Sequence, residues 1–215
     1  MKGPSIRLDL SIRSLEKAFL RSKPGFQAQL KMVPVPSIGH RLVDGVLNSC
    51  IRAGVLILFY PWEDRLHLVL TRRTERVSRH QAQISFPGGR CEHKESFKQT
   101  ALRETQEEMG VLPEDVRILG DLTPLYIPPS NYCIYPVVGI TASRPEFVPS
   151  AKEVAEVIEV PLDHLLDSQN IKKENWTIRG ESVVVPFYFY GGHKIWGATA
   201  MVLAELMEMI KRCES

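Results

Sequence analysis

The sequence lacks any apolar run long enough to cross a membrane, because its longest such stretch, Gly54 to Trp62, has only the length of a β-strand. The amino end also lacks the uninterrupted apolar stretch of a signal peptide. A mitochondrial leader stays open as a weaker alternative, because Asp9 and Glu16 interrupt the basic residues of this end. We therefore expect a cytoplasmic protein with no membrane partner.

Cysteine is sparse. The four cysteines are widely scattered, and no two of them form a Cys-x-x-Cys pair. This spacing excludes the usual zinc-ligand patterns and does not suggest a disulfide framework in a chain of this length. We expect reduced thiols.

The sequence also has little excess of charge of either sign, since its formal net charge is only +2. Such a balance does not favour nucleic-acid binding, so any anion recognition must be local, and we expect a small-molecule partner. A chain of 215 residues with 44% hydrophobic and 24% charged residues is typical of a globular domain. We expect an amino-terminal extension, residues 1–48, packed on a domain of residues 49–215. The sequence leaves a homodimer as an open option.

Strand-like and helix-like patterns alternate along the chain. Periodicity predicts a short helical segment around Leu15 and Ala18, an extended lead-in over residues 27–48, and helices near Ser96 to Met109 and Ala198 to Lys211. Strand candidates lie at 53–60, 67–71, 84–86, 116–119, 133–140, 156–160 and 183–190. The pattern predicts an α/β sandwich, a mixed sheet with flanking helices.

Three glutamates, Glu104, Glu107 and Glu108, stand at positions i, i+3 and i+4. On a helix this spacing places them on one face, where hard carboxylate oxygens suit Mg²⁺ or Mn²⁺. A solvated acidic helix face is the simpler alternative. The two glycines, Gly88 and Gly89, that precede the helix favour the metal site, because backbone there can approach a ligand closely.

The whole arrangement resembles the Nudix box, the signature of the Nudix hydrolases. The matching positions are Gly89, Glu95, Arg103, Glu104, Glu107, Glu108, Gly110 and Val111. Thr105 departs from the pattern, because an aliphatic residue is usual there, and we expect it to point inward. The resemblance implies a Nudix-type α/β/α sandwich and a pyrophosphate-cleaving enzyme.

The chemistry of diphosphate cleavage assigns roles to these residues. An anionic linkage repels hydroxide, so catalysis needs cations on its oxygens and a base for the water. We predict that Glu104 and Glu108 hold the metal with the Gly89 carbonyl, and that Glu107 is a ligand or the base. Arg103 would orient a glutamate, and Glu95 would brace the loop against the helix. The resemblance to the family also implies an alternative base outside the box, Glu153, because in some Nudix enzymes a glutamate outside the box assists the chemistry.

The segment before the box is similar to the motif of the coenzyme A diphosphatase branch of the family. Leu70, Thr71, Arg73, His80, Gln83, Phe86, Pro87, Gly88 and Gly89 match that motif, whereas Ser78 stands where the branch has an arginine. Cationic and polar side chains here are candidates for binding the substrate's phosphates. They are Arg72, Arg73, Arg76, Arg79, His80 and Gln83.

This resemblance implies hydrolysis of coenzyme A or an acyl derivative to adenosine 3′,5′-bisphosphate and phosphopantetheine. One alternative is a Nudix hydrolase of another nucleoside diphosphate derivative or of an oxidised nucleotide. Another class is a non-catalytic Nudix module that senses a nucleotide. The three intact glutamates argue against a sensor.

Overall fold

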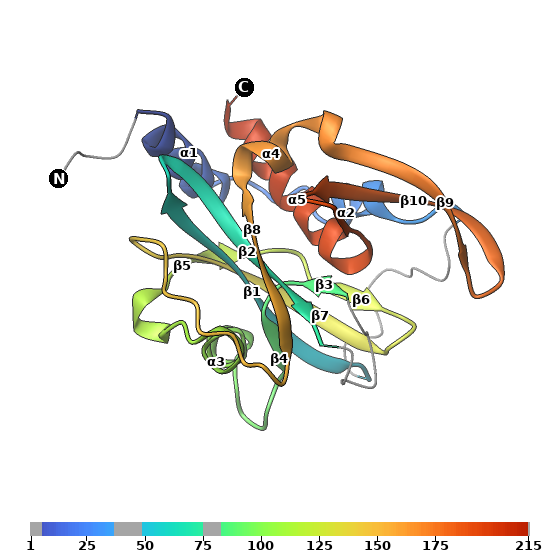
Figure 1. The fold of residues 1–215 in the computed structure, drawn as a ribbon, viewed down its shortest axis with the longest axis horizontal. Helices are drawn as coiled ribbons and strands as arrows, with labels where there is room; N and C mark the ends of the chain where they lie inside the picture. Colours follow the sequence, from blue (N-terminus) through green and yellow to red (C-terminus); the bar gives the residue numbers. More distant parts are fainter. Residues whose placement is uncertain (1–5, 37–48, 75–82, 215) are drawn as a thin grey trace.

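The computed structural model describes residues 6–36, 49–74 and 83–214, and Figure 1 shows them as a layered α/β molecule. In the described ranges, an eight-stranded mixed sheet has the order β3-β2-β1-β7-β5, with β4 beside β1, β6 beside β7 and β8 beside β2. Its strands are β1 (Ile51–Trp62), β2 (Arg65–Arg73), β3 (Ile84–Ser85), β4 (Gly88–Arg90), β5 (Arg117–Asp121), β6 (Leu125–Ile127), β7 (Tyr132–Ile140) and β8 (Val154–Pro161).

The sheet is covered on both faces, and the alternation of side chains along β1 shows how. Ile57 and Phe59 enter one buried cluster, which includes residues of α1 (Ile6–Ala18) and α5 (Gly197–Glu214). Leu56 and Leu58 enter the other, which includes residues of α3 (Phe97–Met109). In Figure 1, α3 lies below the sheet and α1 and α5 lie above it. The expected α/β/α sandwich is confirmed.

A second, three-stranded sheet was not predicted. It has the order β11-β10-β9, formed by β9 (Ile171–Ile178), β10 (Glu181–Tyr190) and β11 (His193–Ile195). Our strand at 183–190 belongs to β10. The pattern did not indicate β9, because the side chains at 172–175 are polar and exposed and so show no apolar alternation.

The expectation of an extended lead-in after residue 27 is wrong for its first part. A helical turn, α2 (Phe26–Gln29), is followed by the 3₁₀ turn η1 (Leu30–Met32), and residues 37–48 lie outside the described part. Ala28 and Met32 stand four residues apart and are both buried, and α2 and η1 pack against α5. Tertiary packing therefore overrides the weak local signal.

Shorter helical segments complete the described chain. They are η2 (Pro113–Asp115), α4 (Leu162–Leu166) and η3 (Ser168–Asn170). None of the helices in the described ranges combines the length and the apolar character needed to cross a membrane.

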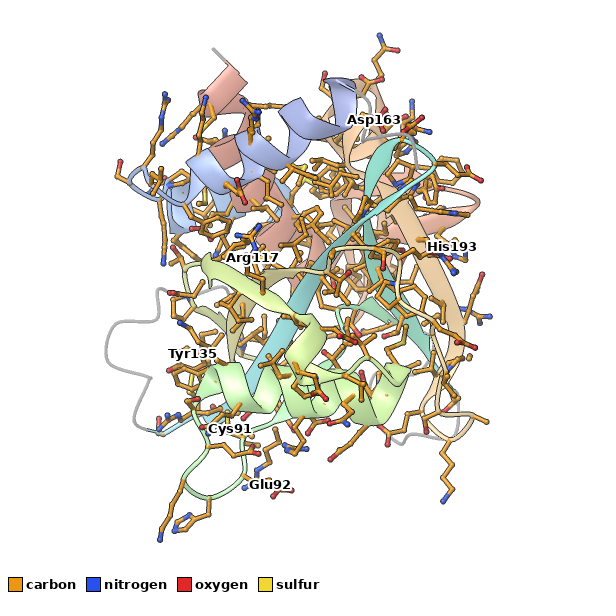
Figure 2. The ribbon with its side chains drawn as sticks, turned by 90° about the vertical axis from the view of Figure 1, so that its left-hand side faces the viewer. Cys91, Glu92, Arg117, Tyr135, Asp163 and His193 are labelled. Carbon is orange, nitrogen blue, oxygen red and sulfur yellow. A yellow bond between two sulfur atoms is a disulfide. The ribbon has the colours of Figure 1, made fainter. Side chains whose placement is uncertain are left out.

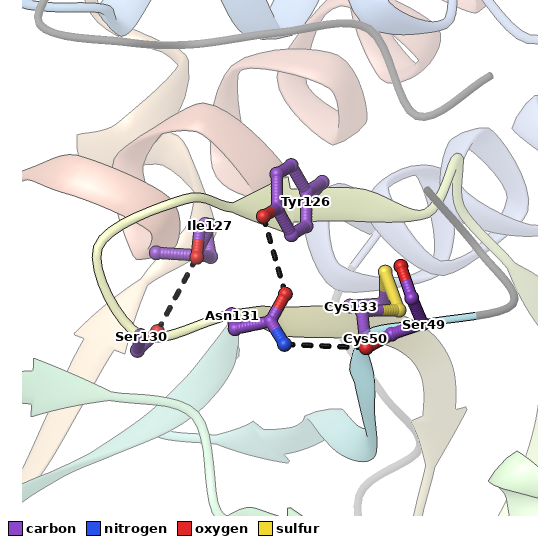
Figure 3. The surroundings of a disulfide bond; sticks show 7 residues. All are labelled: Ser49, Cys50, Tyr126, Ile127, Ser130, Asn131 and Cys133. Carbon is purple, nitrogen blue, oxygen red and sulfur yellow. Dashed lines mark hydrogen bonds between the residues drawn. A yellow bond between two sulfur atoms is a disulfide. The ribbon is translucent and has the colours of Figure 1, made fainter. Parts of the chain in front are cut away.

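The expectation that all cysteines are reduced is wrong for one pair. Cys50 and Cys133 form a disulfide across 83 residues of sequence (Figure 3). Parallel pairing of β1 with β7 sets Arg52 opposite Cys133. Cys50, the residue just before β1, therefore lies within bonding distance of Cys133. Asn131 also ties the strands, because its side-chain amide donates to the Ser49 carbonyl at 3.2 Å. This contact is long-range, so cysteine spacing gives no sign of it. Cys91 and Cys213 are free thiols.

Candidate active site

The acidic helix α3 is fixed at both ends. Ser96 caps its start, where the Ser96 side chain accepts from Gln99 N–H and the Gln99 side chain accepts from Ser96 N–H at 2.9 Å. Gly110 ends it in the left-handed conformation, with φ of 74°. Thr105 faces inward as expected, is buried, and donates to the Ala101 carbonyl at 2.7 Å. The glutamates are therefore carried on a helix of fixed length and rotation.

Glycines allow the strands to approach this helix unusually closely. A Cβ atom on Gly54 of β1 would lie 2.4 Å from the Phe97 carbonyl oxygen of α3. One on Gly89 of β4 would lie 2.4 Å from the carboxylate of Glu104. Any side chain at Gly89 would therefore displace Glu104, and the glycine is needed because backbone and carboxylate lie in contact.

Arg103 forms ion pairs with three of the glutamates. It binds Glu95 in a bidentate manner, with its Nε 2.8 Å and its Nη2 3.1 Å from the two carboxylate oxygens. Its Nη1 lies 2.9 Å from Glu104 and 3.1 Å from Glu107. The hydrogen bond from Arg103 lowers the pKa of Glu95 to about 2, and the pKa of Arg103 itself is raised, first of all by that bond. The roles predicted for Arg103 and Glu95 fit these contacts.

The carboxyl groups of Glu104 and Glu108 are poorly solvated. Burial raises the pKa of Glu108 to about 7, although the Gly88 N–H donates to it at 3.1 Å. Burial also raises the pKa of Glu104. Both groups therefore resist ionisation until a cation compensates them. Among the described residues, Arg73 forms an ion pair with Glu108, with its guanidinium 3.5 Å from the carboxylate.

A divalent ion fits this donor set in part. In the described part of the chain, no three acidic, histidine or cysteine side chains converge as a closed metal site. Glu107 is turned toward Arg103 and its side chain is 56% exposed. Glu104, Glu108 and the backbone at Gly88–Gly89 nevertheless bring hard oxygens together, and the two desolvated carboxyl groups would be stabilised by a cation. An open site of this kind leaves positions for water and for a phosphate oxygen.

The structure brings Glu153 to the same place. Arg73 lies between two carboxylates, 3.5 Å from Glu108 and 3.7 Å from Glu153. The negative charge of Glu153 also contributes to the raised pKa values of Glu104 and Glu108. Glu153 is 45% exposed, so water reaches it. It remains a candidate base alongside Glu107.

Glu104 borders a cavity of about 680 Å³. Glu104, Gly89 and Arg73 line it near α3, and Ile134 and Trp196 are among the apolar residues that line it elsewhere. The volume suits a nucleotide-sized ligand. Trp196 is half-buried in this wall and meets Trp176 edge to face. Cys91 and Glu92 lie on the loop that leads into α3, below the helix in Figure 2.

The predicted phosphate-binding residues are not all placed together. Arg73 and Gln83 line the cavity. Arg72 instead binds Glu156, with 2.8 Å between the guanidinium and the carboxylate, and His193 contacts the other oxygen of that carboxylate at 3.1 Å. Three further candidates, Arg76, Arg79 and His80, lie outside the described residues.

Two arginines of the cavity were missed by sequence reasoning. Arg90 follows Gly89 on β4, and Arg179 lies at the turn between β9 and β10. Arg90 stood inside the recognised motif and its position beside Gly89 was a usable signal. The sequence offered no such signal for Arg179, because this residue is distant in sequence from the motif and the second sheet was not expected.

Comparison with known proteins agrees with the geometry. A family model described as the NUDIX domain matches residues 51–179. The chain belongs to the Nudix hydrolase family. It is a pyrophosphohydrolase, and Nudix hydrolases generally use divalent metal ions.

Its relatives lie near the coenzyme A diphosphatase branch. An uncharacterized Nudix hydrolase, NudL, of Photorhabdus laumondii is 32% identical over 184 residues, which cover 85% of this chain and 94% of that protein. The human mitochondrial coenzyme A diphosphatase NUDT8 is 33% identical over 147 residues, 66% of this chain and 62% of the human protein. Among solved structures, a MutT protein from Methanosarcina mazei is 17% identical with a TM-score of 0.49, covering 77% of this chain and 95% of that one.

Proposed function

We propose that this Nudix hydrolase cleaves the diphosphate linkage of coenzyme A or acyl-coenzyme A, giving adenosine 3′,5′-bisphosphate and phosphopantetheine or its acyl form. The observation that carries the proposal is the pair of desolvated carboxyl groups on α3, Glu104 and Glu108, of which Glu104 lines a nucleotide-sized cavity. The similarity to a human protein named as a coenzyme A diphosphatase supports the choice of substrate.

We propose Mg²⁺ or Mn²⁺ as the cofactor, held by Glu104, Glu108 and the Gly89 carbonyl, with Glu107 as a further candidate ligand. The metal would supply positive charge to the diphosphate oxygens and lower the pKa of water. Arg103 holds Glu104 and Glu107 in place through its two short contacts. Arg73 positions Glu108 and Glu153 in the same way. Glu107 or Glu153 takes the proton from the attacking water.

We also propose that residues 1–48 form an extension packed on the domain of residues 49–215, and α1 and α2 do pack on α5. For its location we propose the cytoplasm, with a homodimer as an untested option, and without nucleic-acid or membrane partners.

The proposal is tested with a substrate panel. Coenzyme A, a short and a long acyl-coenzyme A, ADP-ribose and an oxidised nucleoside triphosphate would each be assayed with Mg²⁺ and with Mn²⁺. We expect the coenzyme A compounds to give the highest kcat/KM and adenosine 3′,5′-bisphosphate as the product. A clear preference for ADP-ribose or for the oxidised nucleotide would refute the coenzyme A assignment and leave the family chemistry standing.

The same assay tests the proposed metal-binding role of Glu104 and Glu108. Glu104→Gln and Glu108→Gln keep the shape of the side chain and remove a ligand charge, so turnover should collapse while circular dichroism stays unchanged. Glu63→Gln, in the exposed turn between β1 and β2, is the matched control and should retain activity. Near-normal turnover in either box variant would remove that residue from the proposed metal site.

A further inference from the structure

The second sheet contributes part of the cavity lining. Ile178 and Arg179, at the turn that joins β9 to β10, line the same cavity as Gly89 and Glu104. A ligand that fills the cavity therefore touches both the acidic helix and this turn. The β9–β10 turn brings a basic side chain to a site otherwise assembled from the main sheet.

The cations of the cavity differ in what they bind. Arg73 is occupied by Glu108 and Glu153, at 3.5 and 3.7 Å. Arg179 is exposed and forms no ion pair with any residue in the described ranges. A guanidinium that borders a ligand cavity and has no acidic partner there is available to an anion of the ligand.

The turn itself does not call for an arginine. Ile178 pairs with Glu181, so Arg179 and Gly180 form a two-residue hairpin turn, with φ of 54° and 83°. Positive φ at both central positions favours Asn-Gly, and an arginine in the left-handed region costs free energy relative to asparagine or glycine. Strain of this kind is found where a side chain serves another purpose.

Much of the cavity lining is apolar. Ile127, Ile134, Trp196 and Ala198 are among the residues that line it. Such a lining suits a base or an alkyl chain, whereas phosphates belong beside the charged residues. A ligand with anionic groups at two separate places, joined by a less polar part, matches this distribution.

We propose that Arg179 is a specificity-determining residue that binds a phosphate of the substrate remote from the diphosphate, such as a monophosphate on the ribose. The inference rests on the proposed function and refines it. The proposal assigns recognition of the remote phosphate to Arg179 rather than to Arg73, because Arg73 already contacts the carboxylates of Glu108 and Glu153. Coenzyme A should then be preferred to dephospho-coenzyme A because of Arg179.

The test replaces Arg179 with asparagine, the residue that best suits the turn. Arg179→Asn should leave the melting temperature unchanged or higher, so lost selectivity would not reflect misfolding. We expect the kcat/KM preference for coenzyme A over dephospho-coenzyme A to shrink on the order of tenfold or more, as for a lost charge-assisted hydrogen bond. Arg179→Lys should retain part of the preference. Lys173→Ala removes an exposed cation that lies on β9, the strand that precedes the turn, and does not line the cavity, so this variant should retain all of the preference.

Calorimetry separates this inference from the proposed function, because it needs no turnover. Adenosine 3′,5′-bisphosphate should bind the wild type more tightly than adenosine 5′-monophosphate, and Arg179→Asn should remove that difference. This result would support the role of Arg179 even if coenzyme A were not cleaved. Equal affinity for the two nucleotides, no measurable binding of the bisphosphate, or an unchanged difference in Arg179→Asn would overturn it.

Discussion

At the scale of single residues, the chemistry depends on which glutamate is free to accept a proton. Glu104 and Glu108 are desolvated, and Glu95 is held by two bonds from Arg103. Glu107 and Glu153 are more exposed than these three, at 56% and 45%. Exposure keeps both in contact with water, so we propose that the base is one of this pair.

A pair of variants distinguishes the two. The neutral replacement of the true base should lower kcat by about 10²–10⁴-fold, the usual contribution of general-base catalysis, and change KM much less. We expect a large loss in only one of Glu107→Gln and Glu153→Gln, measured at saturating metal. Small losses in both variants would contradict the assignment of the base to either residue.

At the scale of elements, the loop before α3 is fastened to the helix by one carboxylate. Glu95 receives Arg103 from the helix and also accepts from the Thr100 hydroxyl at 2.9 Å and from Glu92 N–H at 3.1 Å. The loop also carries Cys91 and Glu92, seen in Figure 2. Its position relative to the glutamates therefore depends on Glu95 remaining ionised.

The contact between Glu95 and Arg103 predicts that the free energy of unfolding depends on pH in the acidic range. The pKa of Glu95 falls from 4.5 to about 2 on folding, chiefly through the Arg103 hydrogen bond. A lowered pKa stabilises the fold above the unfolded value, and the contribution is lost as pH falls from about 4.5 toward 2. Glu95→Gln should therefore lower the free energy of unfolding at pH 6 by on the order of 2–3 kcal/mol, with a smaller difference near pH 3. Urea denaturation at both pH values measures it, with Glu63→Gln as control. A deficit that does not shrink with falling pH would contradict this origin.

At the scale of the whole molecule, two sheets and a covalent link form the cavity. The main sheet is layered between α3 and the α1–α5 side, and the second sheet adds the turn at Arg179 (Figure 1). The Cys50–Cys133 bond joins β1 to β7, and Tyr132 and Ile134, the neighbours of Cys133, line the cavity. The bond thus stabilises one wall of the site.

Reduction of this bond should lower stability by about 2–4 kcal/mol, the usual contribution of a disulfide that closes a long loop. Denaturation with and without reductant measures the change. The Cys50→Ser/Cys133→Ser variant should be insensitive to reductant, and the Cys91→Ser/Cys213→Ser variant should respond as the wild type does. Alkylation of the unreduced, denatured protein should label two of its four cysteines. Labelling of all four would contradict the presence of the bond in the isolated protein.

Local patterns were sufficient for much of the molecule. The spacing of Glu104, Glu107 and Glu108 with Gly89 predicted an acidic helix behind a glycine turn, and α3 follows with its cap at Ser96 and its end at Gly110. Apolar periodicity likewise predicted α5 and six of the eight strands described in the main sheet, but not the short strands β4 and β6. These features depend on residues near one another in sequence, where propensity, capping and burial act together.

Tertiary structure alone decided the contacts between distant residues. It placed Arg73 between Glu108 and Glu153, turned Arg72 to Glu156, and joined Cys50 to Cys133. It also brought Arg179 to the cavity through β9, whose polar, exposed side chains carry no periodic signal. Composition and spacing indicate which chemical groups a chain possesses. Which groups meet is set by strand register and by packing between elements far apart in sequence, and this is why the sequence could indicate the acids that we propose as metal ligands but not the arginine that we propose for selectivity.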